Sequence, residues 1–205
     1  MEQYTLFEKL LEYYHLSKDD YLELQKDYTL ENFTDGHIFK DIDLAVSLVK
    51  NAINNHQKIM IYGDYDCDGI MGTSILVKAL NLLDYRPEFY IPSRYIEGYG
   101  ITLEKAKDFV NEGFNLVITV DNGISCYEAI SYLREHGTDV LIIDHHQVGE
   151  TVPNANYIIH PQYSGFSELA TSGAFTAFMF TSHLLGYKDK YLATLAAISL
   201  ISDMM

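Results

Sequence analysis

The sequence predicts an α/β fold, in which helices cover both faces of a parallel sheet and a small helical N-terminal lead precedes the sheet. From residue 58 onward, short apolar runs alternate with longer segments whose apolar residues recur at helical spacing. These runs are continuously apolar, as strands of a parallel sheet buried on both faces are. Residues 1–35 are rich in Tyr, Leu, Glu and Lys and lack strand signals. We therefore expect a helical lead over 1–35 and one α/β domain over 36–205.

The expected elements follow one another in a regular order. The strand-like segments are short, apolar and followed by turn residues; they are 58–62, 88–92, 116–120 and 139–144. The helical segments are longer and amphipathic or apolar; they are 41–55, 70–84, 103–113, 125–137, 172–186 and 190–205. Asp41 or Asp43 is expected to cap the first of these helices, and Ser125 a later one. Gly113 and Gly137 stand where helices are expected to end.

The bulk composition limits the classes of protein to which the chain can belong. Its 205 residues are 48% hydrophobic and 21% charged, which suffices for a packed core and argues against wholesale disorder. No apolar run reaches membrane-spanning length, and residues 1–10 lack a signal-peptide pattern. Two cysteines, Cys67 and Cys126, cannot form a disulfide framework. We therefore expect a cytoplasmic protein.

Acidic and imidazole side chains follow three of the predicted strands. Because parallel strands carry their carboxyl ends to one edge of the sheet, these side chains are expected to converge there. The residues concerned are Asp64, Asp66 and Asp68 after the first strand, Asp121 after the third, and Asp144, His145 and His146 after the fourth. A single Asp at a strand end is often only a turn former or helix cap. Their joint occurrence at three strand ends favours a metal site.

Electrostatics favours the same interpretation. Two carboxylates ~4 Å apart repel by about 4 kcal/mol at an effective dielectric near 20, so the cluster needs protons or divalent ions. Many Asp oxygens with few His nitrogens suit Mn²⁺ or Mg²⁺, whereas Zn²⁺ favours thiolates or several imidazoles. Two such ions about 3.5–4 Å apart are typical of phosphoester hydrolysis. The net charge of −15 is unfavourable for binding nucleic acid unless bound cations reverse the field locally.

The sequence motifs resemble those of a known superfamily. "YGDYDCDGI", "TVDNGI", "IDHHQVG" and "AISLISD" occur in the order of the motifs of the DHH phosphoesterase superfamily. "IPSRYIEGYG", together with "DIDLAVSLVKNAI" upstream, is similar to its RecJ branch, the 5′-to-3′ exonucleases specific for single-stranded DNA. The resemblance extends over residues 37–205.

The resemblance implies roles for particular residues. Asp121, His145 and His146 would be catalytic, with Asp121 bridging two ions and His146 facing the scissile phosphate. Asp144 would orient a histidine. The implied metal ligands are Asp64, Asp66, Asp68, Asp121, His145 and Asp203.

Three residues outside the acidic cluster are candidates for binding substrate, each with a plainer alternative. Arg94 would contact phosphate, or is a surface residue beside a turn. Ser172 and Gly173 would present helix N-terminal amides to a phosphate, unless Ser172 is merely a cap.

The resemblance also implies an activity. It implies a metal-dependent phosphodiesterase of DNA repair and recombination that hydrolyses single-stranded DNA from the 5′ end with metal-activated water. The alternatives are an enzyme acting on short oligoribonucleotides or cyclic dinucleotides, and a catalytically dead replication scaffold. Residues 36–205 would be the DHH catalytic domain, cut before a DHH-associated C-terminal domain. We therefore expect weak binding of single-stranded DNA by this chain, and the sequence does not indicate which proteins, if any, it binds.

Overall fold

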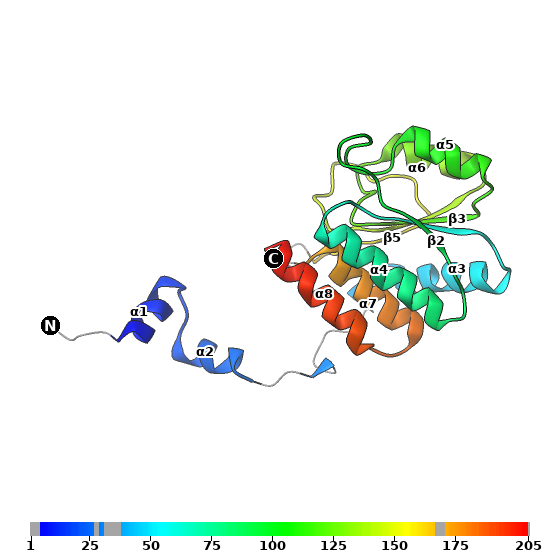
Figure 1. Cartoon of the computed structure of the whole chain (residues 1–205). Coiled ribbons are helices and arrows are strands. Elements are labelled where there is room, and N and C mark those ends of the chain that lie inside the picture. The colour runs from blue at the N-terminus through cyan, green and yellow to red at the C-terminus, as the bar shows by residue number, and fades with distance from the viewer. Residues whose placement is uncertain (1–4, 27–28, 31–37, 167–170, 205) are drawn as a thin grey trace. The chain divides into compact units, whose positions relative to one another are not determined.

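The computed structural model describes residues 5–26, 29–30, 38–166 and 171–204. The chain divides into two compact units, Met1–Phe33 and Thr34–Met205 (Figure 1). The smaller unit contains two short helices, α1 (Leu6–Tyr13) and α2 (Lys18–Leu24). Each begins with a capping box, in which a hydroxyl and a carboxylate three residues apart satisfy each other's backbone amides.

The larger unit is built on a parallel sheet. Among its described residues, five strands lie in the order β2-β1-β3-β4-β5, and every neighbouring pair is parallel. The strands are β1 (Ile59–Tyr62), β2 (Glu88–Tyr90), β3 (Leu116–Val120), β4 (Asp139–Ile143) and β5 (Tyr157–Ile159). The chain passes from β1 to β2 on one side and then to β3 on the other side of β1. This reversal makes a switch point between β1 and β3, where open parallel sheets bind their ligands.

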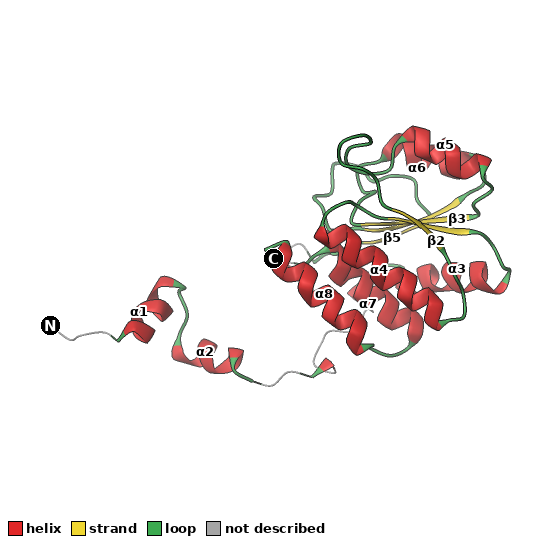
Figure 2. Ribbon diagram, in the orientation of Figure 1, coloured by secondary structure: helices red, strands yellow, loops and turns green. Residues whose placement is uncertain are grey.

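Helices cover both faces of this sheet, which confirms the predicted fold class (Figure 2). Helices α5 and α6 lie on one face, and α3, α4, α7 and α8 lie on the other side (Figure 1). Their bounds are α3 (Ile42–Asn54), α4 (Cys67–Leu82), α5 (Leu103–Asn111), α6 (Tyr127–Glu135), α7 (Gly173–Leu185) and α8 (Lys190–Ser202), with a 3-10 turn, η3 (Gln162–Ser164), after β5.

Buried side chains alternate between the two faces of each central strand. In β3, Val117 packs in the cluster formed with α5 and α6, whereas Val120 faces α4. Gly72 of α4 lies so close to β3 that an added Cβ would stand 2.6 Å from Cγ2 of Val120. A glycine therefore lets α4 pack tightly against the strand that delivers Asp121.

Some predicted helix ends differ from those in the structure. Ser125 is not the cap of α6: Cys126 holds that position without a side-chain cap bond, after a turn in which its amide donates to the Gly123 carbonyl. Asp41 is the N-cap of α3, but its side chain makes no capping bond. Helix α8 ends at Ser202 rather than at the last residue, which lies outside the described residues.

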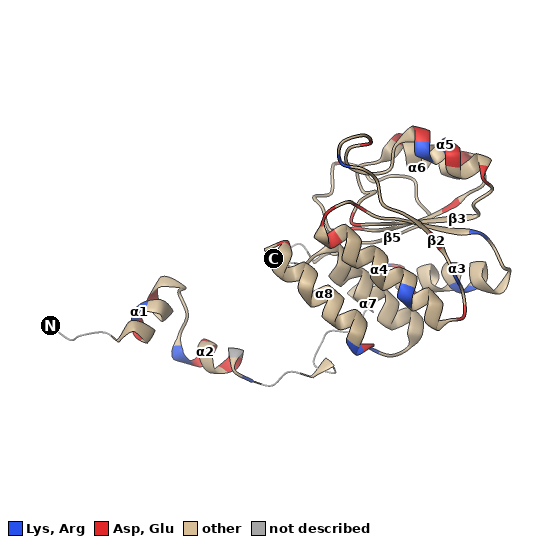
Figure 3. Cartoon of the chain, viewed as in Figure 1, with Lys and Arg blue, Asp and Glu red and all other residues tan. Residues whose placement is uncertain are grey.

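The described helices can be compared with the helix that a membrane span requires. None of them combines the length and the apolar character that a membrane span requires. Acidic residues (red in Figure 3) occur at the end of the larger unit where α4 begins and α8 ends. Because these helix ends lie beside the carboxyl ends of the strands, some of the acidic side chains lie beside the switch point.

Candidate metal centre

The acidic and imidazole groups predicted from the sequence come together at the carboxyl ends of β1, β3 and β4. Three overlapping groups of potential ligand atoms have all their members within 4.8 Å of one another. The groups are Asp121 with His145 and His146, Asp68 with His145 and Asp203, and Asp64 with Asp66 and Asp121. The structure thus brings these seven residues to one place, and their assignment as ligands stays a prediction.

The turn between β1 and α4 gives its three aspartates different surroundings. Asp64 is buried directly after the strand. Asp66 is exposed and caps α4, its Oδ1 accepting a bond of 2.9 Å from the Gly69 amide. Asp68 lies in the first helical turn and is buried again. The alternation of the Asp-x-Asp-x-Asp pattern therefore places two carboxylates inside the site and one at its rim.

Asp68 is held by the N-terminus of α7. Its two oxygens accept bonds of 2.7 Å from the Gly173 amide and 2.8 Å from the Ala174 amide. The partial positive charge of a helix N-terminus stabilises a carboxylate in this position. Ser199 of α8 also donates to Asp68, and its hydroxyl lies 2.7 Å from that of Ser172. One buried carboxylate thus joins the starts of α4 and α7 to α8.

These bonds bear on the expected roles of Ser172 and Gly173. Ser172 is the N-cap of α7, because its hydroxyl accepts a bond of 3.1 Å from the Phe175 amide. The Gly173 amide is used by a protein carboxylate rather than by a free anion site. Contact of Ser172 or Gly173 with substrate therefore stays a prediction, and neither of these hydrogen bonds supports it.

Asp121 occupies an unfavourable position without a cation. Its backbone is left-handed, with φ of 62°, and its Oδ1 is a buried oxygen without a hydrogen-bond donor among the described residues. Burial, together with the nearby Asp68 and Asp66 carboxylates, raises the pKa of Asp121 from 3.8 to about 10. The Nε2 atom of His145 lies 3.2 Å from this oxygen.

Asp144 is the opposite case, a fully buried carboxylate whose two oxygens both face donors. Oδ2 accepts from the Ile124 amide at 3.0 Å, and Oδ1 accepts from the amides of His145 (2.8 Å) and His146 (3.2 Å). Nδ1 of His146 lies 2.8 Å from Oδ1. Burial alone would raise the pKa of Asp144, but the bonds and charge of His146 and the bond from Ile124 outweigh it and lower the pKa. An ionised Asp144 thus fixes the geometry of both histidines.

These contacts define the protonation of the His146 ring. Because Asp144 only accepts, Nδ1 of His146 carries the proton that the two share. Burial alone would lower the pKa of His146, but the Asp144 bond and the Asp144 and Asp121 charges outweigh it and raise the pKa, which favours a proton on Nε2 as well. The Tyr99 hydroxyl lies 2.9 Å from the same Nδ1 and donates to the Asp121 carbonyl at 3.2 Å. Tyr99 therefore connects the segments after β3 and β4, a role that its position in the sequence did not indicate.

His145 faces a ring of carboxylates. Its Nε2 lies 3.2 Å from Asp121, 3.4 Å from Asp68 and 3.8 Å from Asp203. Asp203 follows the last turn of α8, and burial and the Asp68 charge raise the pKa of its carboxyl. One imidazole nitrogen among three carboxylates is the donor set that a divalent ion would share.

Arg94 lies apart from the ligand groups. Its side chain is exposed, and its guanidinium carbon stands 5.4 Å from the centre of the Tyr65 ring. Tyr65 in turn lies between Asp64 and Asp66 in the chain. Arg94 thus sits at the rim of the site, and its contact with phosphate stays a prediction.

The residues fit a divalent cation. Oδ1 of Asp64 and Oδ1 of Asp121 are buried acceptors without a donor among the described residues, and a cation is the partner such oxygens lack. The donors are mainly carboxylate oxygens with one or two imidazole nitrogens and no thiolate in the three groups. This set suits Mn²⁺ or Mg²⁺ rather than a structural Zn²⁺.

Gly173 is required by space as well as by hydrogen bonding. A Cβ added there would lie 2.8 to 2.9 Å from Cβ, Cα and Oδ1 of Asp121. We expect Gly173→Ala to displace Asp121 and to weaken Mn²⁺ binding at least ~10-fold, as loss of a supporting contact typically does. Isothermal calorimetry measures this, with Gly149→Ala as the control, because its added Cβ would meet only a side-chain hydroxyl at 3.2 Å and a carbonyl at 3.7 Å. Equal affinities in the two variants would contradict this packing argument.

Comparison with known proteins decides the family. The model of the DHH family, N-terminal domain, matches residues 58–200, which include all the strands of the sheet and nearly all of the candidate site. The chain belongs to the DHH family. The resemblance drawn from the sequence motifs is thereby confirmed.

This DHH chain is similar to proteins of the RecJ branch. It is 40% identical over 178 residues to the single-stranded-DNA-specific exonuclease RecJ of Bacillus subtilis (strain 168), covering 85% of this chain and 22% of that protein. A crystal structure of exonuclease RecJ bound to manganese matches with a TM-score of 0.74 and 34% identity, over 80% of this chain and 43% of that one. RecJ of Thermus thermophilus in complex with Mn²⁺ matches with a TM-score of 0.70 and 31% identity, over 80% and 24%. The chain thus spans about a quarter of the length of the curated relatives it matches.

Proposed function

We propose that this chain carries the metal-binding centre of a RecJ-like phosphodiesterase, which hydrolyses single-stranded DNA from the 5′ end in DNA repair and recombination. The observation that carries the proposal is that Nε2 of His145 lies 3.2 Å from an Asp121 oxygen and 3.4 Å from an Asp68 oxygen at the switch point. The RecJ proteins bound to manganese, similar in sequence and fold, support it. The catalytic part would be residues 36–205, with residues 1–35 as a separate lead.

The proposed ligands are Asp64, Asp66, Asp68, Asp121, His145 and Asp203. Two divalent ions held there would supply the water-activating and Lewis-acid chemistry of phosphodiester hydrolysis. Asp144 holds Nδ1 of His146, so that Nε2 of this ring is presented to a phosphate oxygen. Arg94, from the rim of the site, would bind a phosphate bidentately.

The charge of the chain is consistent with a substrate that binds through metal. The chain has 14 Lys and Arg residues but 29 Asp and Glu residues, so basic side chains provide few phosphate contacts. Filling the centre with divalent ions would reverse the local field where the scissile phosphate must lie.

The experiment compares substrates at fixed Mn²⁺ concentration. We expect this chain to shorten 5′-labelled single strands faster than duplex DNA, and this hydrolysis to stop when EDTA is added. Preferential hydrolysis of short oligoribonucleotides or cyclic dinucleotides would instead favour another branch of the superfamily. Failure to bind any divalent ion would favour a catalytically dead scaffold.

A further inference from the structure

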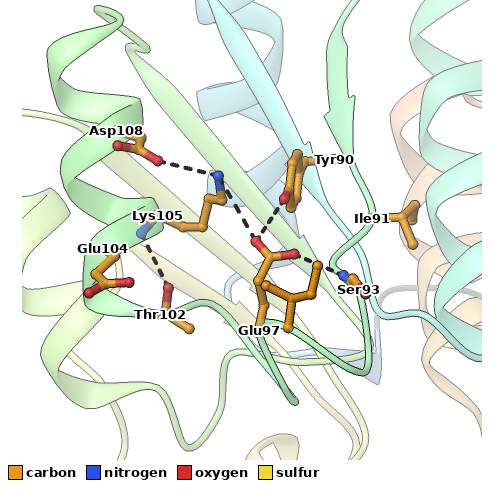
Figure 4. A pocket seen from close by; sticks show the side chains of 9 residues that line it. Tyr90, Ile91, Ser93, Glu97, Thr102, Glu104, Lys105 and Asp108 are labelled. Atoms are coloured by element: carbon orange, nitrogen blue, oxygen red, sulfur yellow. Dashed lines mark hydrogen bonds and ion pairs between the residues drawn. The ribbon is translucent and has the colours of Figure 1, made fainter.

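The motif "IPSRYIEGYG" forms a loop, residues 91–100, between β2 and α5. Tyr99 of this loop contacts His146 at the metal centre, and Arg94 lies over the Tyr65 ring at the rim of the site. On the α5 side, the loop borders a hollow of about 520 Å³, which is lined by residues of the loop, of β2 and of α5 (Figure 4). Among the residues of loop 91–100, Glu97 is the one whose side chain bonds Tyr90 and Ser93 beside this hollow (Figure 4).

The Glu97 carboxylate ties three segments together. Its Oε1 accepts a bond of 2.7 Å from the Tyr90 hydroxyl at the end of β2, and its Oε2 accepts one of 2.8 Å from the Ser93 amide. The Lys105 ammonium of α5 stands 3.9 Å from Oε1 (Figure 4). Only 16% of the Glu97 side chain is exposed, so these partners replace water. Burial opposes its charge, but the bonds from Tyr90 and Ser93 and the Lys105 charge lower the pKa of the carboxyl.

The middle of the loop has little packing of its own. Tyr95 and Ile96, next to Glu97, are 96% and 85% exposed. Gly98 and Gly100 have φ of 76° and 78°, so the chain turns twice between Glu97 and α5. An exposed, glycine-containing loop keeps one conformation only where interior bonds fix it.

The two ends of the loop reach the metal centre on either side of Glu97. Three residues before it, Arg94 stands over the Tyr65 ring in the β1–α4 turn. Two residues after it, Tyr99 contacts His146 and the Asp121 carbonyl. Glu97 therefore lies in the chain between the residue at the rim of the site and the residue that contacts His146.

We propose that Glu97 is a positioning residue, whose partly buried carboxylate fixes the loop 91–100 so that Arg94 is held at the rim of the metal centre and Tyr99 against His146. Its effect on DNA hydrolysis rests on the proposed function. Its effect on the order of the loop does not, and the two are measured separately.

Limited proteolysis of the metal-free protein reports the order of the loop directly. Trypsin cleaves after Arg94, and we expect Glu97→Ala to speed this cleavage roughly tenfold, because losing a hydrogen bond to a charged group shifts a local opening equilibrium by about that factor. Cleavage after Arg134, on α6, serves as the internal reference and is expected to keep its rate. Glu104→Ala is the matched control, since Glu104 lines the same hollow and no hydrogen bond or ion pair joins it to the loop among the described residues.

Two further variants separate a positioning role from a general loss of structure. In Glu97→Gln, the amide oxygen accepts from Ser93 and the amide nitrogen donates to Tyr90, so cleavage is expected to stay within roughly threefold of wild type. Tyr90→Phe removes one donor only and is expected to give an intermediate rate, and it carries the test if Glu97→Ala does not fold. Equal rates of cleavage after Arg94 in wild type and in Tyr90→Phe or Glu97→Ala would overturn the proposal.

The functional arm uses the same variants. Glu97→Ala is expected to keep the Mn²⁺ affinity of wild type, measured by calorimetry, while its hydrolysis of 5′-labelled single-stranded DNA falls at least ~10-fold, a typical cost of misplacing catalytic groups. Unchanged hydrolysis in a variant whose loop has loosened would show that Glu97 orders the loop without positioning the reaction. If the wild-type chain hydrolyses no nucleic acid, the proposed function fails, and the proteolysis result still decides the role of Glu97 in the loop.

Discussion

Replacing Asp121 with Asn is expected to make the metal-free protein more stable and to abolish the proposed phosphodiesterase activity of the metal-loaded protein. Asp121 is buried, its Oδ1 has no donor among the described residues, and burial with the nearby carboxylates raises its pKa to about 10. The neutral amide of Asn has no charge to bury beside the other carboxylates. Since one pKa unit corresponds to about 1.4 kcal/mol, the free energy of unfolding should rise by at least about that amount.

The stability of the metal-free protein should also depend on pH with a definite sign. Asp121 holds its proton in the folded state up to about pH 10, whereas the unfolded chain releases it near the ordinary value of 3.8. The contribution of Asp121 therefore makes stability fall as pH rises from about 4 to about 10. Urea unfolding in EDTA at several pH values measures this slope, and Asp121→Asn should remove it.

The control for Asp121→Asn is an aspartate with the same backbone but no burial. Asp84 has φ of 58° and is exposed, so Asp84→Asn reports what asparagine gains in a left-handed conformation alone. Activity of Asp121→Asn should fall by on the order of 10³, because metal ions contribute several kcal/mol to stabilising transition-state charge. A variant that was destabilised, or that kept turning over DNA, would contradict the role given to Asp121.

Replacing Asp144 with Asn is expected to have the opposite effect on stability. Both Asp144 oxygens accept bonds, from Ile124 on one side and from His145 and His146 on the other. An amide NH₂ must face a donor in either orientation, so we expect a loss on the order of 3 kcal/mol in urea unfolding. Because the pKa of Asp144 is lowered, its contribution is present above the unfolded pKa and is lost as pH falls through the folded pKa.

The same substitution should weaken the metal centre without removing a ligand. Asp144 orients His145 and His146, and loss of such support typically costs about 10- to 100-fold in metal affinity. Asp139→Asn is the matched control, because Asp139 lies at the other end of β4, where it bonds Arg134 and Asn156. Calorimetry with Mn²⁺ should separate the two variants, and equal affinities would refute the orienting role of Asp144.

The contrast between Asp121 and Asp144 shows what the sequence can predict. Both residues follow apolar β-branched strands, so the parallel topology was enough to bring them to one edge of the sheet. Their different electrostatics depend on donors from elsewhere: the Ile124 amide lies 20 residues before Asp144. The spacing of apolar residues in a sequence predicts whether a segment is a helix or a strand. It does not predict which distant backbone amide will donate to a given carboxylate.

The residues that hold the candidate metal ligands in place were not predicted from the sequence, for the same reason. Ser199 reaches Asp68 across 131 residues, and nothing in an apolar helix marks that serine as a buried hydrogen-bond donor. Gly173 was considered for its amide, whereas the structure also requires it for its close approach to Asp121. Ser125 was expected to cap α6 on local preference, but the turn at Gly123, with φ of 113°, moves the helix start past it.

Anomalous diffraction at the manganese absorption edge, from crystals of this chain grown with Mn²⁺, would show whether the strand ends hold metal. We expect a peak within coordination distance, about 2–2.5 Å, of both Oδ1 of Asp121 and Nε2 of His145. This peak should disappear from crystals of Asp121→Asn. A peak bound only elsewhere, or none beside Asp121 at saturating Mn²⁺, would contradict the assignment of these strand ends as a metal centre.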